Sequence, residues 1–333
     1  MLAQNKEFNN IKVHTQYSIC EGAIKIDELA DYCKTNKIKA IGLADSYNLC
    51  GALEFAEKIS KVGTQPIIGT QINLLYENII GKITLYAISE KGYKNLTKLS
   101  SSSYLNNKTN YDPHCELKDL ILNNEDLILL TGNYNDFFGK LFYANKLKNI
   151  ETIFDELKSA FQDRLYIEIQ RHSESQEVSF ENYLLQTSST YDLPLIAGQE
   201  VYYLDSSMAE AHDALICIGE KQFVDDQSRF RYSNQHYIKK NEELIKLYQD
   251  IPEALENNYN FPLRFNFKPK KSKPILPSIS TNKDTTSENE LMDQAKSGLK
   301  ERLNNFVFKK NKSHTHDSIK KVYEERLLHE LNI

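Results

Sequence analysis

Hydrophobic and polar residues follow each other along the first seventy residues in an order that predicts a β-α-β-α-β unit. Apolar residues at i, i+3, i+4 and i+7 predict helices, and short apolar runs predict strands. Gly63 follows the second helix, at a position where helices commonly stop. Helical crossovers connect parallel strands, so we expect polar residues at the carboxyl ends of these strands to form a site. The predicted strands are Ile11–His14, Ile38–Ala44 and Pro66–Leu74, and the predicted helices are Ile26–Lys34 and Ala52–Val62.

The same alternation of strands and helices continues to about residue 200. Five or more such alternations favour a barrel or a doubly wound sheet, and the pattern alone does not choose between them. Further strands are predicted over Lys82–Ile88, Asp126–Thr131, Leu165–Ile169 and Leu193–Ala197. Further helices are predicted over Asp136–Leu147, Ile150–Phe161 and Ser179–Tyr191, and another begins within Tyr93–Leu99.

The composition changes near residue 263. Residues 268–274 are rich in lysine and proline, and a run rich in Ser, Thr and Asn follows. We interpret this region as an extended, solvated linker in preference to a DNA-binding arm. Ser287 and Glu290 have the spacing of a capping box at the start of a helix. The predicted linker covers 263–286, and the predicted helices cover Ser287–Leu303 and Asp317–Leu331.

Composition and charge are those of an ordinary globular protein. Of the 333 residues 40% are hydrophobic and 26% are charged, and the net charge of -5 excludes a polycation that coats nucleic acid. No apolar run approaches the ~18 residues of a membrane span, so we expect no membrane association. The five cysteines are scattered and include no CxxC pair, which indicates reduced thiols in the cytoplasm.

Several short motifs carry a family resemblance. In the opening region they are His14–Ser18, Glu21–Ala23, Ala44–Leu49, Gly51–Phe55 and Gln65–Gly69. These motifs resemble the polymerase-and-histidinol-phosphatase (PHP) domain, and more narrowly the PHP domain of bacterial DNA polymerase III alpha subunits, the C-family replicative polymerases. The resemblance covers nearly the whole chain, because it continues at Gly92–Leu96, Ala211–Leu215, Asp225–Asp226, Tyr237–Leu244 and Val322–Leu327.

The resemblance implies an α/β fold, a distorted barrel of β/α units. It implies a PHP domain over 1–262, a linker over 263–286, and the start of a polymerase palm domain over 287–333. We expect the chain to be an N-terminal fragment that lacks the palm carboxylates and their magnesium ions, with no cofactor in this stretch. The implied partners of the whole polymerase are DNA, deoxynucleoside triphosphates, a proofreading exonuclease subunit, the sliding clamp and other subunits of the polymerase III holoenzyme.

The resemblance also implies where a metal site would lie. PHP phosphoesterases hold up to three metals with histidines and carboxylates at strand ends, and a bound metal makes water nucleophilic. Only His14, Glu21 and Glu200 keep ligand-type side chains at the matching positions. Lysines repel a dication when protonated, so we expect a degraded pocket without catalytic residues. The pocket positions are Lys12, His14, Glu21, Asp45, Ser46, Gln71, Lys82, Asn133, Glu200 and Tyr202.

Lys12 stands where the resemblance implies the first metal ligand. We expect its ammonium to replace the metal charge and to offset the repulsion between Glu21, Asp45 and Glu200. For His14 we favour a hydrogen-bonded histidine at the strand end over a metal ligand.

For the other histidines we expect structural roles and not catalytic or metal-binding ones. His314 and His316 have HxH spacing, but they precede a helix and have no partner ligands nearby in the sequence, so we interpret them as a solvated N-cap region. His172 and His212 lie in family-like stretches, and we expect hydrogen bonding from His212. The sequence contains neither a glycine-rich phosphate loop nor a GxSxG elbow.

Three functions compete at this point. The first is part of a DNA polymerase III alpha subunit whose PHP domain braces the polymerase domains and docks the exonuclease. The second is an active metal-dependent PHP phosphoesterase or 3′-5′ exonuclease, which needs the ligands that are mostly absent. The third is a free-standing scaffold, which requires Ile333 to be a true terminus.

Overall fold

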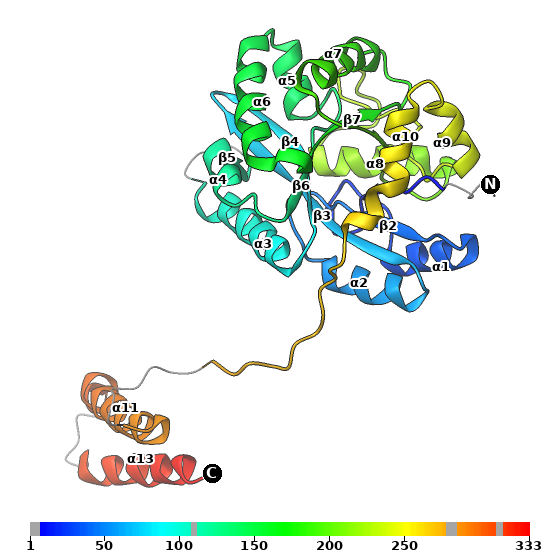
Figure 1. The fold of residues 1–333 in the computed structure, drawn as a ribbon. Coiled ribbons are helices and arrows are strands. Elements are labelled where there is room, and N and C mark those ends of the chain that lie inside the picture. Colours follow the sequence, from blue (N-terminus) through cyan, green and yellow to red (C-terminus); the bar gives the residue numbers. More distant parts are fainter. Residues whose placement is uncertain (1–6, 108–111, 278–284, 311–315) are drawn as a thin grey trace. The chain divides into compact units, whose positions relative to one another are not determined.

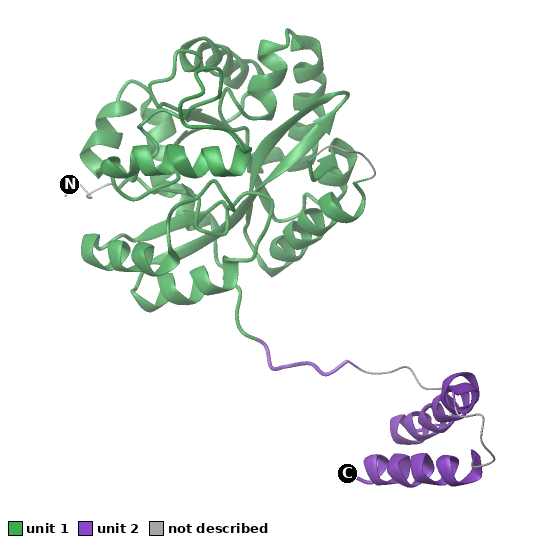
Figure 2. Cartoon of the chain, turned by 180° about the vertical axis from the view of Figure 1, so that it is seen from behind, with its two compact units in different colours: residues 1–271 green, residues 272–333 purple. Residues whose placement is uncertain are grey.

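The computed structural model describes residues 7–107, 112–277, 285–310 and 316–333. The chain divides into two units, Met1–Lys271 and Ser272–Ile333 (Figures 1 and 2). Unit 1 contains the sheet, and unit 2 is helical. The division falls inside the predicted linker of 263–286, of which residues 278–284 lie outside the described residues.

The predicted β-α-β-α-β unit opens unit 1. Its strands are parallel, with Val13 opposite Leu43 and Ala40 opposite Gln65. Gly63 has a φ of 86° directly after the second helix, which confirms the predicted stop. The elements are β1 (Lys12–Val13), α1 (Ile26–Asn36), β2 (Ala40–Leu43), α2 (Ala52–Lys61) and β3 (Gln65–Tyr76).

The rest of the sheet is mixed, which the sequence pattern did not predict. β3 turns back into β4 (Ile79–Ala87) as an antiparallel pair, and β4 is antiparallel to β6 (Leu127–Leu130). The parallel order resumes with β7 (Leu165–Gln170) and β8 (Leu195–Gly198). The third and fourth strands are therefore joined by a turn and not by a helical crossover.

The sheet is a nearly closed barrel. Its strand order is β8-β7-β6-β4-β3-β2-β1-β9, and β5 (His114–Glu116) pairs with β3 beside this path. β9 (Glu200–Val201) pairs with β1 and follows β8 after the single residue Gln199. The two ends of the sheet are thus consecutive in the chain. Of the two architectures that the pattern allowed, the barrel is confirmed.

Helices surround the barrel (Figure 1). They are α3 (Glu90–Leu105), α4 (Leu117–Leu122), α5 (Phe137–Tyr143), α6 (Leu147–Phe161), α7 (Glu177–Tyr191), α8 (Ala209–Glu220), α9 (Asn241–Leu247) and α10 (Pro252–Asn260). The predicted helix over Asp136–Leu147 is shorter, because Asn145 has a left-handed φ of 56° and interrupts it. Among the described residues, no helix is both long and apolar enough to cross a membrane.

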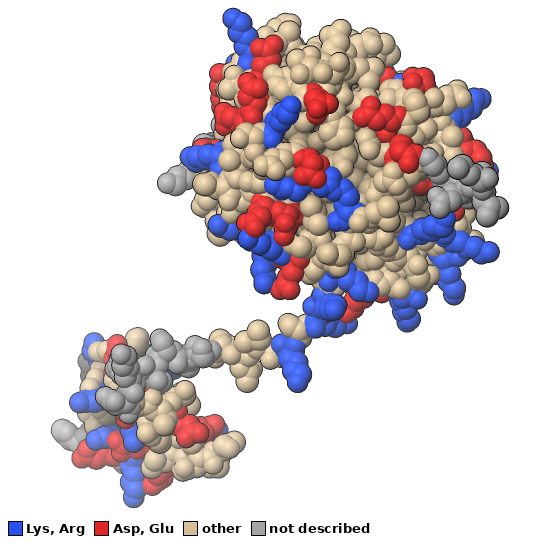
Figure 3. All heavy atoms as spheres, viewed as in Figure 1, with Lys and Arg blue, Asp and Glu red and all other residues tan. Residues whose placement is uncertain are grey.

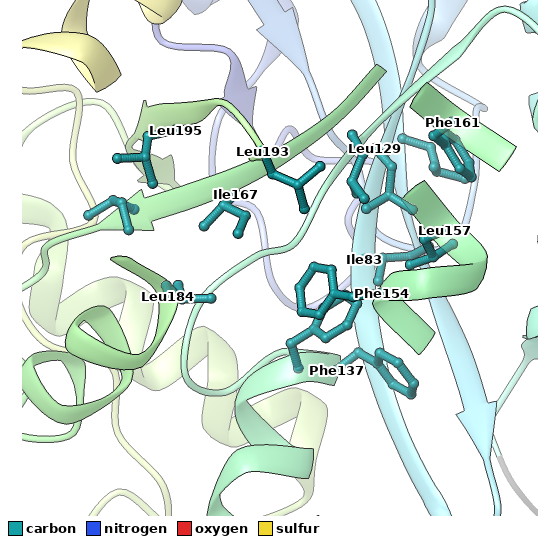
Figure 4. Packing of buried hydrophobic residues seen from close by; sticks show 14 of the residues in the cluster. Ile83, Leu129, Phe137, Phe154, Leu157, Phe161, Ile167, Leu184, Leu193 and Leu195 are labelled. Atoms are coloured by element: carbon teal, nitrogen blue, oxygen red, sulfur yellow. The ribbon is translucent and has the colours of Figure 1, made fainter. Parts of the chain in front are cut away.

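The largest hydrophobic core lies between the sheet and α5 to α7 (Figure 4). Leu129 of β6 and Ile167 of β7 are buried in it together with Leu157 of α6. The rings of Phe138 and Phe154 stack with centroids 4.6 Å apart. Truncating a buried phenylalanine costs about 3–5 kcal/mol, so this core fixes β6 and β7, which carry part of the site described below.

Unit 2 contains the two helices expected after the linker. Thr286, and not Ser287, caps the first helix, since its hydroxyl accepts a hydrogen bond from the backbone N–H of Asn289 at 3.3 Å. The predicted capping box was therefore wrong by one residue. The elements are α11 (Ser287–Arg302), a π-helical turn (Leu303–Val307), α12 (Phe308–Lys310) and α13 (His316–Leu331).

Candidate functional site

Polar side chains from several strands meet at one end of the barrel. Parallel strands bring their carboxyl ends to the same edge, which is where such folds build sites. A cavity of about 220 Å³ opens there. Among its lining residues are Glu21, Lys82, Asn133, Asp136, Glu200, Tyr202 and Tyr232. The structure therefore brings together five of the pocket positions that the sequence singled out.

Lys12 lies at the centre of this site, fully buried. Its Nζ is 3.4 Å from Asp136 Oδ2, 3.4 Å from Glu168 Oε2 and 3.5 Å from Glu200 Oε1. We call these three carboxylates the carboxylate cradle. A buried ammonium is costly unless it is paired. Here it is surrounded by Glu168 of β7, Glu200 of β9 and Asp136, which directly precedes α5.

Two glycines make room for the cradle. A Cβ on Gly198 would lie 2.2 Å from Glu168 Oε1, and a Cβ on Gly132 would lie 2.3 Å from Asp136 Oδ2. Gly132 also has a φ of 82°, which disfavours other residues. Both carboxylates thus occupy the space that a side chain at the glycine would fill.

The charges of the cradle depend on one another. Burial alone would lower the pKa of Lys12, but Glu168, Glu200 and Asp136 raise it above its usual value. Burial would raise the pKa of Glu200, yet Lys12 and the hydrogen bond from His14 hold it well below its usual range. Burial raises the pKa of Asp136 and Glu168, with Lys12 opposing in both cases. Glu200 is therefore the ionised partner of the Lys12 ammonium.

His14 and Tyr202 flank Glu200. His14 Nε2 lies 3.0 Å from Glu200 Oε1, and its Nδ1 lies 3.2 Å from the hydroxyl of Ser18. The rings of His14 and Tyr202 stack with centroids 4.5 Å apart. Both nitrogens of the imidazole have protein partners, which agrees with the expectation of a hydrogen-bonded histidine at the strand end.

A second lysine neutralises the acid that follows the first strand. Lys82 Nζ lies 2.8 Å from both carboxylate oxygens of Glu21 and donates to the hydroxyl of Ser46 at 3.2 Å. Ser46 in turn donates to Glu21 Oε2 at 2.5 Å. Burial would raise the pKa of Glu21, but Lys82 lowers it. Glu21 is thus held as a carboxylate by an ammonium.

Two side-chain amides donate hydrogen bonds to the Glu200 carboxylate, one to each oxygen. Gln71 Nε2 donates to Glu200 Oε1 at 2.8 Å, and Asn133 Nδ2 donates to Glu200 Oε2 at 3.1 Å. Amide nitrogens donate hydrogen bonds and do not bind cations. Positions 71 and 133 therefore stabilise the Glu200 carboxylate directly.

Two of the expected partners of Lys12 were wrong. Among the described residues, the ion pairs of Lys12 are with Asp136, Glu168 and Glu200. Glu21 pairs with Lys82 instead. Asp45 accepts hydrogen bonds from the backbone and hydroxyl of Thr15 and from Ser18, at 2.6 to 2.8 Å. Burial raises the pKa of Asp45.

Asp136 and Glu168 were missed because neither belongs to the motifs that carry the resemblance. Signals were present nonetheless. Glu168 is the one acid in a mostly apolar strand, and Asp136 follows β6 by a few residues, after Gly132. An acid in a buried strand needs a cation nearby, and Lys12 is the buried cation of the opening strand.

A second feature that the sequence did not predict is a pair of buried imidazoles. His172 and His236 stack in parallel with centroids 4.1 Å apart. His172 Nε2 accepts from the backbone N–H of Glu200 at 3.3 Å, and His236 Nδ1 lies 3.1 Å from the Glu200 carbonyl oxygen. Burial lowers the pKa of His172 to about 3 and that of His236 well below its usual value. Both imidazoles are therefore neutral, and together they hold the backbone of Glu200 in place.

The other histidines lie away from the cradle or act structurally. His212 Nε2 lies 2.9 Å from the Glu21 carbonyl oxygen, as the expected hydrogen bonding requires. His316 begins α13, while His314 lies outside the described residues.

The pocket residues do not fit a metal centre. The Lys12 ammonium occupies the point where three carboxylates converge, and the Lys82 ammonium covers Glu21. In the ranges that the structure describes, no group of three or more His, Cys, Asp or Glu side chains is arranged to hold a metal ion. A dication would have to displace a charged, buried lysine.

Comparisons with known proteins agree with this fold. The PHP domain model matches residues 10–172. The DNA polymerase III subunit alpha of Caulobacter vibrioides is 36% identical over 311 residues, which cover 90% of this chain and 27% of that protein. The corresponding subunit of Rickettsia bellii is 35% identical over 329 residues, covering 98% of this chain and 28% of that protein.

A comparison with solved structures finds a similar chain at low identity. It is a two-domain protein from Bacteroides vulgatus, described as containing a predicted PHP-like metal-dependent phosphoesterase. The match has 9% identity and a TM-score of 0.39, and it covers 72% of this chain and 62% of that chain. This chain spans less than a third of the length of the curated relatives that it matches. It contains a PHP domain and belongs to the family of DNA polymerase III alpha subunits.

Proposed function

We propose that this chain is the PHP-containing part of a replicative DNA polymerase and that its PHP domain has a structural role. The relatives that support the proposal are named DNA polymerase III subunit alpha. In this proposal the whole protein extends a primer on template DNA from deoxynucleoside triphosphates. The carboxylates and magnesium ions of nucleotidyl transfer belong to polymerase domains outside these 333 residues.

The observation that carries the structural role is the position of the Lys12 ammonium within the carboxylate cradle. In a PHP hydrolase, bound metals offset the repulsion of clustered acids and supply the nucleophile. An ammonium offsets the same repulsion but supplies no nucleophile. The domain thus keeps the charge balance of such a site without its hydrolytic chemistry.

The proposed partners follow from the family. DNA and nucleotides would bind the whole polymerase in the cytoplasm, and a proofreading exonuclease subunit would dock on the PHP domain. The sliding clamp and further holoenzyme subunits would bind elsewhere on the complete protein. A separate exonuclease supports the proposal, because it makes hydrolysis by the PHP pocket dispensable.

A hydrolysis assay tests the structural role. The purified chain is incubated with single-stranded DNA and with a chromogenic phosphodiester, in the presence of manganese or zinc. We expect no hydrolysis above that of the Glu200→Gln variant. Hydrolysis by the wild type that Glu200→Gln abolishes would place a working hydrolase in this pocket and contradict the proposal. Equal hydrolysis by both proteins would identify a contaminating nuclease, and the structural role would stand.

A further inference from the structure

Residues 265–271 form an extended segment on the outside of unit 1, and its first residue, Phe265, is buried against the barrel. Phe265 is buried, and its ring lies 5.0 Å from that of Phe261 and 6.2 Å from that of Tyr86. Gln65 Nε2 donates to the carbonyl oxygen of Phe265 at 3.1 Å. The backbone after this point is therefore fixed against the barrel.

The segment makes two further contacts with unit 1, one near its start and one at its end. The backbone N–H of Asn266 donates to the carbonyl oxygen of Ile88 at 3.4 Å. Lys271 pairs with Glu57 of α2 at 2.9 Å. The residues between these contacts, Lys268 to Lys270, therefore lie along the surface of unit 1.

Phe267 separates two grooves. Its ring contacts Tyr93 of α3, with centroids 5.3 Å apart and planes tilted by 38°, and both rings are partly exposed. The first groove, of about 700 Å³, is lined by Glu90, Tyr93, Lys94, Thr97, Asn266, Phe267, Lys268, Pro269 and Lys270. The second groove, of about 440 Å³, is lined on its other side by residues where α2 passes into β3, namely Ser60, Gly63, Thr64, Gln65 and Pro66.

The charge along the first groove is positive, although the chain as a whole carries a net charge of -5. Glu90 is already paired with Lys94, and Glu57 with Lys271. Within the described part of the chain, Lys268 and Lys270 have no carboxylate at ion-pairing distance. Lysine side chains gather where the segment leaves unit 1 (Figure 3).

Contrary to the interpretation of residues 268–274 as a solvated linker, we propose that the groove lined by Tyr93, Phe267, Lys268 and Lys270 binds single-stranded nucleic acid. Proteins that bind single strands combine a positive groove for the backbone with aromatic rings on which bases stack. Here Lys268 and Lys270 would contact phosphates, and Tyr93 and Phe267 would stack with unpaired bases. A duplex has no free base faces to stack on the two rings, whereas a single strand can use both the lysines and the rings. The proposal is independent of whether the PHP pocket hydrolyses anything.

Fluorescence anisotropy of the full 333-residue chain tests the proposal, with a labelled oligothymidine of roughly 20 nucleotides as the probe. Lys268→Gln/Lys270→Gln should weaken binding about tenfold and reduce the salt slope by about 1.4. Phe267→Leu and, separately, Tyr93→Leu should weaken it about fivefold or more, because each removes a stacking ring. The matched control is Lys34→Gln/Lys246→Gln, which removes the same charge from exposed positions elsewhere on unit 1.

Thermal unfolding of each variant shows that it is folded before binding is compared. The two aromatic variants lie on different elements, so a local distortion at one position cannot explain a loss of binding in both. An unchanged affinity in the control and a loss in the groove variants support the proposal. An equal loss in the control would show general attraction to charge and overturn it. Tighter binding of a duplex or of a labelled polyglutamate than of the oligothymidine would also overturn it, the latter in favour of an acidic protein partner.

Discussion

Lys12 and Glu200 stand directly opposite each other in the parallel pairing of β1 with β9, and Lys12 Nζ lies 3.5 Å from Glu200 Oε1. Both side chains are buried. Since β9 is one end of the strand order and follows β8 at the other end, the ion pair lies where the barrel closes. The ion pair therefore joins two parts of the sheet that are far apart in sequence.

Removing the Lys12 ammonium should destabilise unit 1 strongly. Lys12→Met keeps the length of the side chain but leaves Asp136, Glu168 and Glu200 buried without their cation. Breaking a buried pair in this way costs about 3–5 kcal/mol. We expect a loss of that size in the free energy of unfolding measured with denaturant at neutral pH. Lys34→Met, at an exposed position, serves as the control, and equal stability of the two variants would show that the cradle does not need the ammonium.

A methyl group at position 198 should disrupt the cradle by displacing the Glu168 carboxylate. In Gly198→Ala the Cβ would lie 2.2 Å from Glu168 Oε1, so the Glu168 carboxylate must leave the position in which its Oε2 contacts Lys12. We expect a loss of about 2 kcal/mol or more in unfolding free energy. Gly298→Ala is the matched control, because a Cβ there meets nothing within 4 Å, and it should be neutral or stabilising.

Shortening Glu168 should relieve that clash. The double variant Gly198→Ala/Glu168→Ala is expected to lose less stability than the sum of its single variants. Additive losses would mean that the methyl group clashes with something other than the Glu168 carboxylate.

The His172–His236 pair predicts a loss of stability in acid. Burial lowers the pKa of His172 to about 3, whereas an unfolded histidine titrates near pH 6.5. The unfolded chain therefore binds a proton that the folded chain does not, and stability falls as the pH drops from about 6.5 toward 3. Each such histidine contributes a slope of about 1.4 kcal/mol per pH unit. Raised pKa values of Asp136 and Glu168 act in the opposite direction at lower pH, so variants must be compared with the wild type.

His172→Gln isolates this effect. Glutamine can accept the hydrogen bond from the Glu200 backbone but does not titrate. Its unfolding free energy, measured between pH 6 and 4, should fall less steeply than that of the wild type by about 1.4 kcal/mol per pH unit. His329→Gln, at an exposed position in α13, should leave the slope unchanged. Parallel curves for His172→Gln and the wild type would show that His172 is not held neutral.

The sequence predicted those parts of the molecule that local pattern determines. The opening β-α-β-α-β unit follows from apolar spacing. The family resemblance singled out Lys12, Gln71, Lys82 and Glu200, although Gln71 and Lys82 lie within β3 and β4 and not at strand ends. The antiparallel turn from β3 into β4 was missed, because the strands of a hairpin and of a crossover have similar apolar runs.

The partners of Lys12 could not be predicted in full, because they depend on contacts between distant segments. Asp136 and Glu168 lie more than one hundred residues from Lys12 in the chain and reach it only when β6 and β7 join the barrel. A signal existed in Gly132 and Gly198, but their clearance for carboxylates is visible only in three dimensions.

The most direct test of the central claim, that Lys12 takes the place of a metal charge, compares thermal unfolding with and without manganese. Purified wild-type chain and Lys12→Ala are each measured after treatment with EDTA and again with excess manganese. We expect the wild-type Tm to be the same in both conditions. We expect Lys12→Ala to unfold at a lower temperature and to regain part of the loss with manganese, because the vacated cradle of Asp136, Glu168 and Glu200 offers carboxylate oxygens to the ion. A wild-type Tm that rises with manganese, with no added response in Lys12→Ala, would contradict the account.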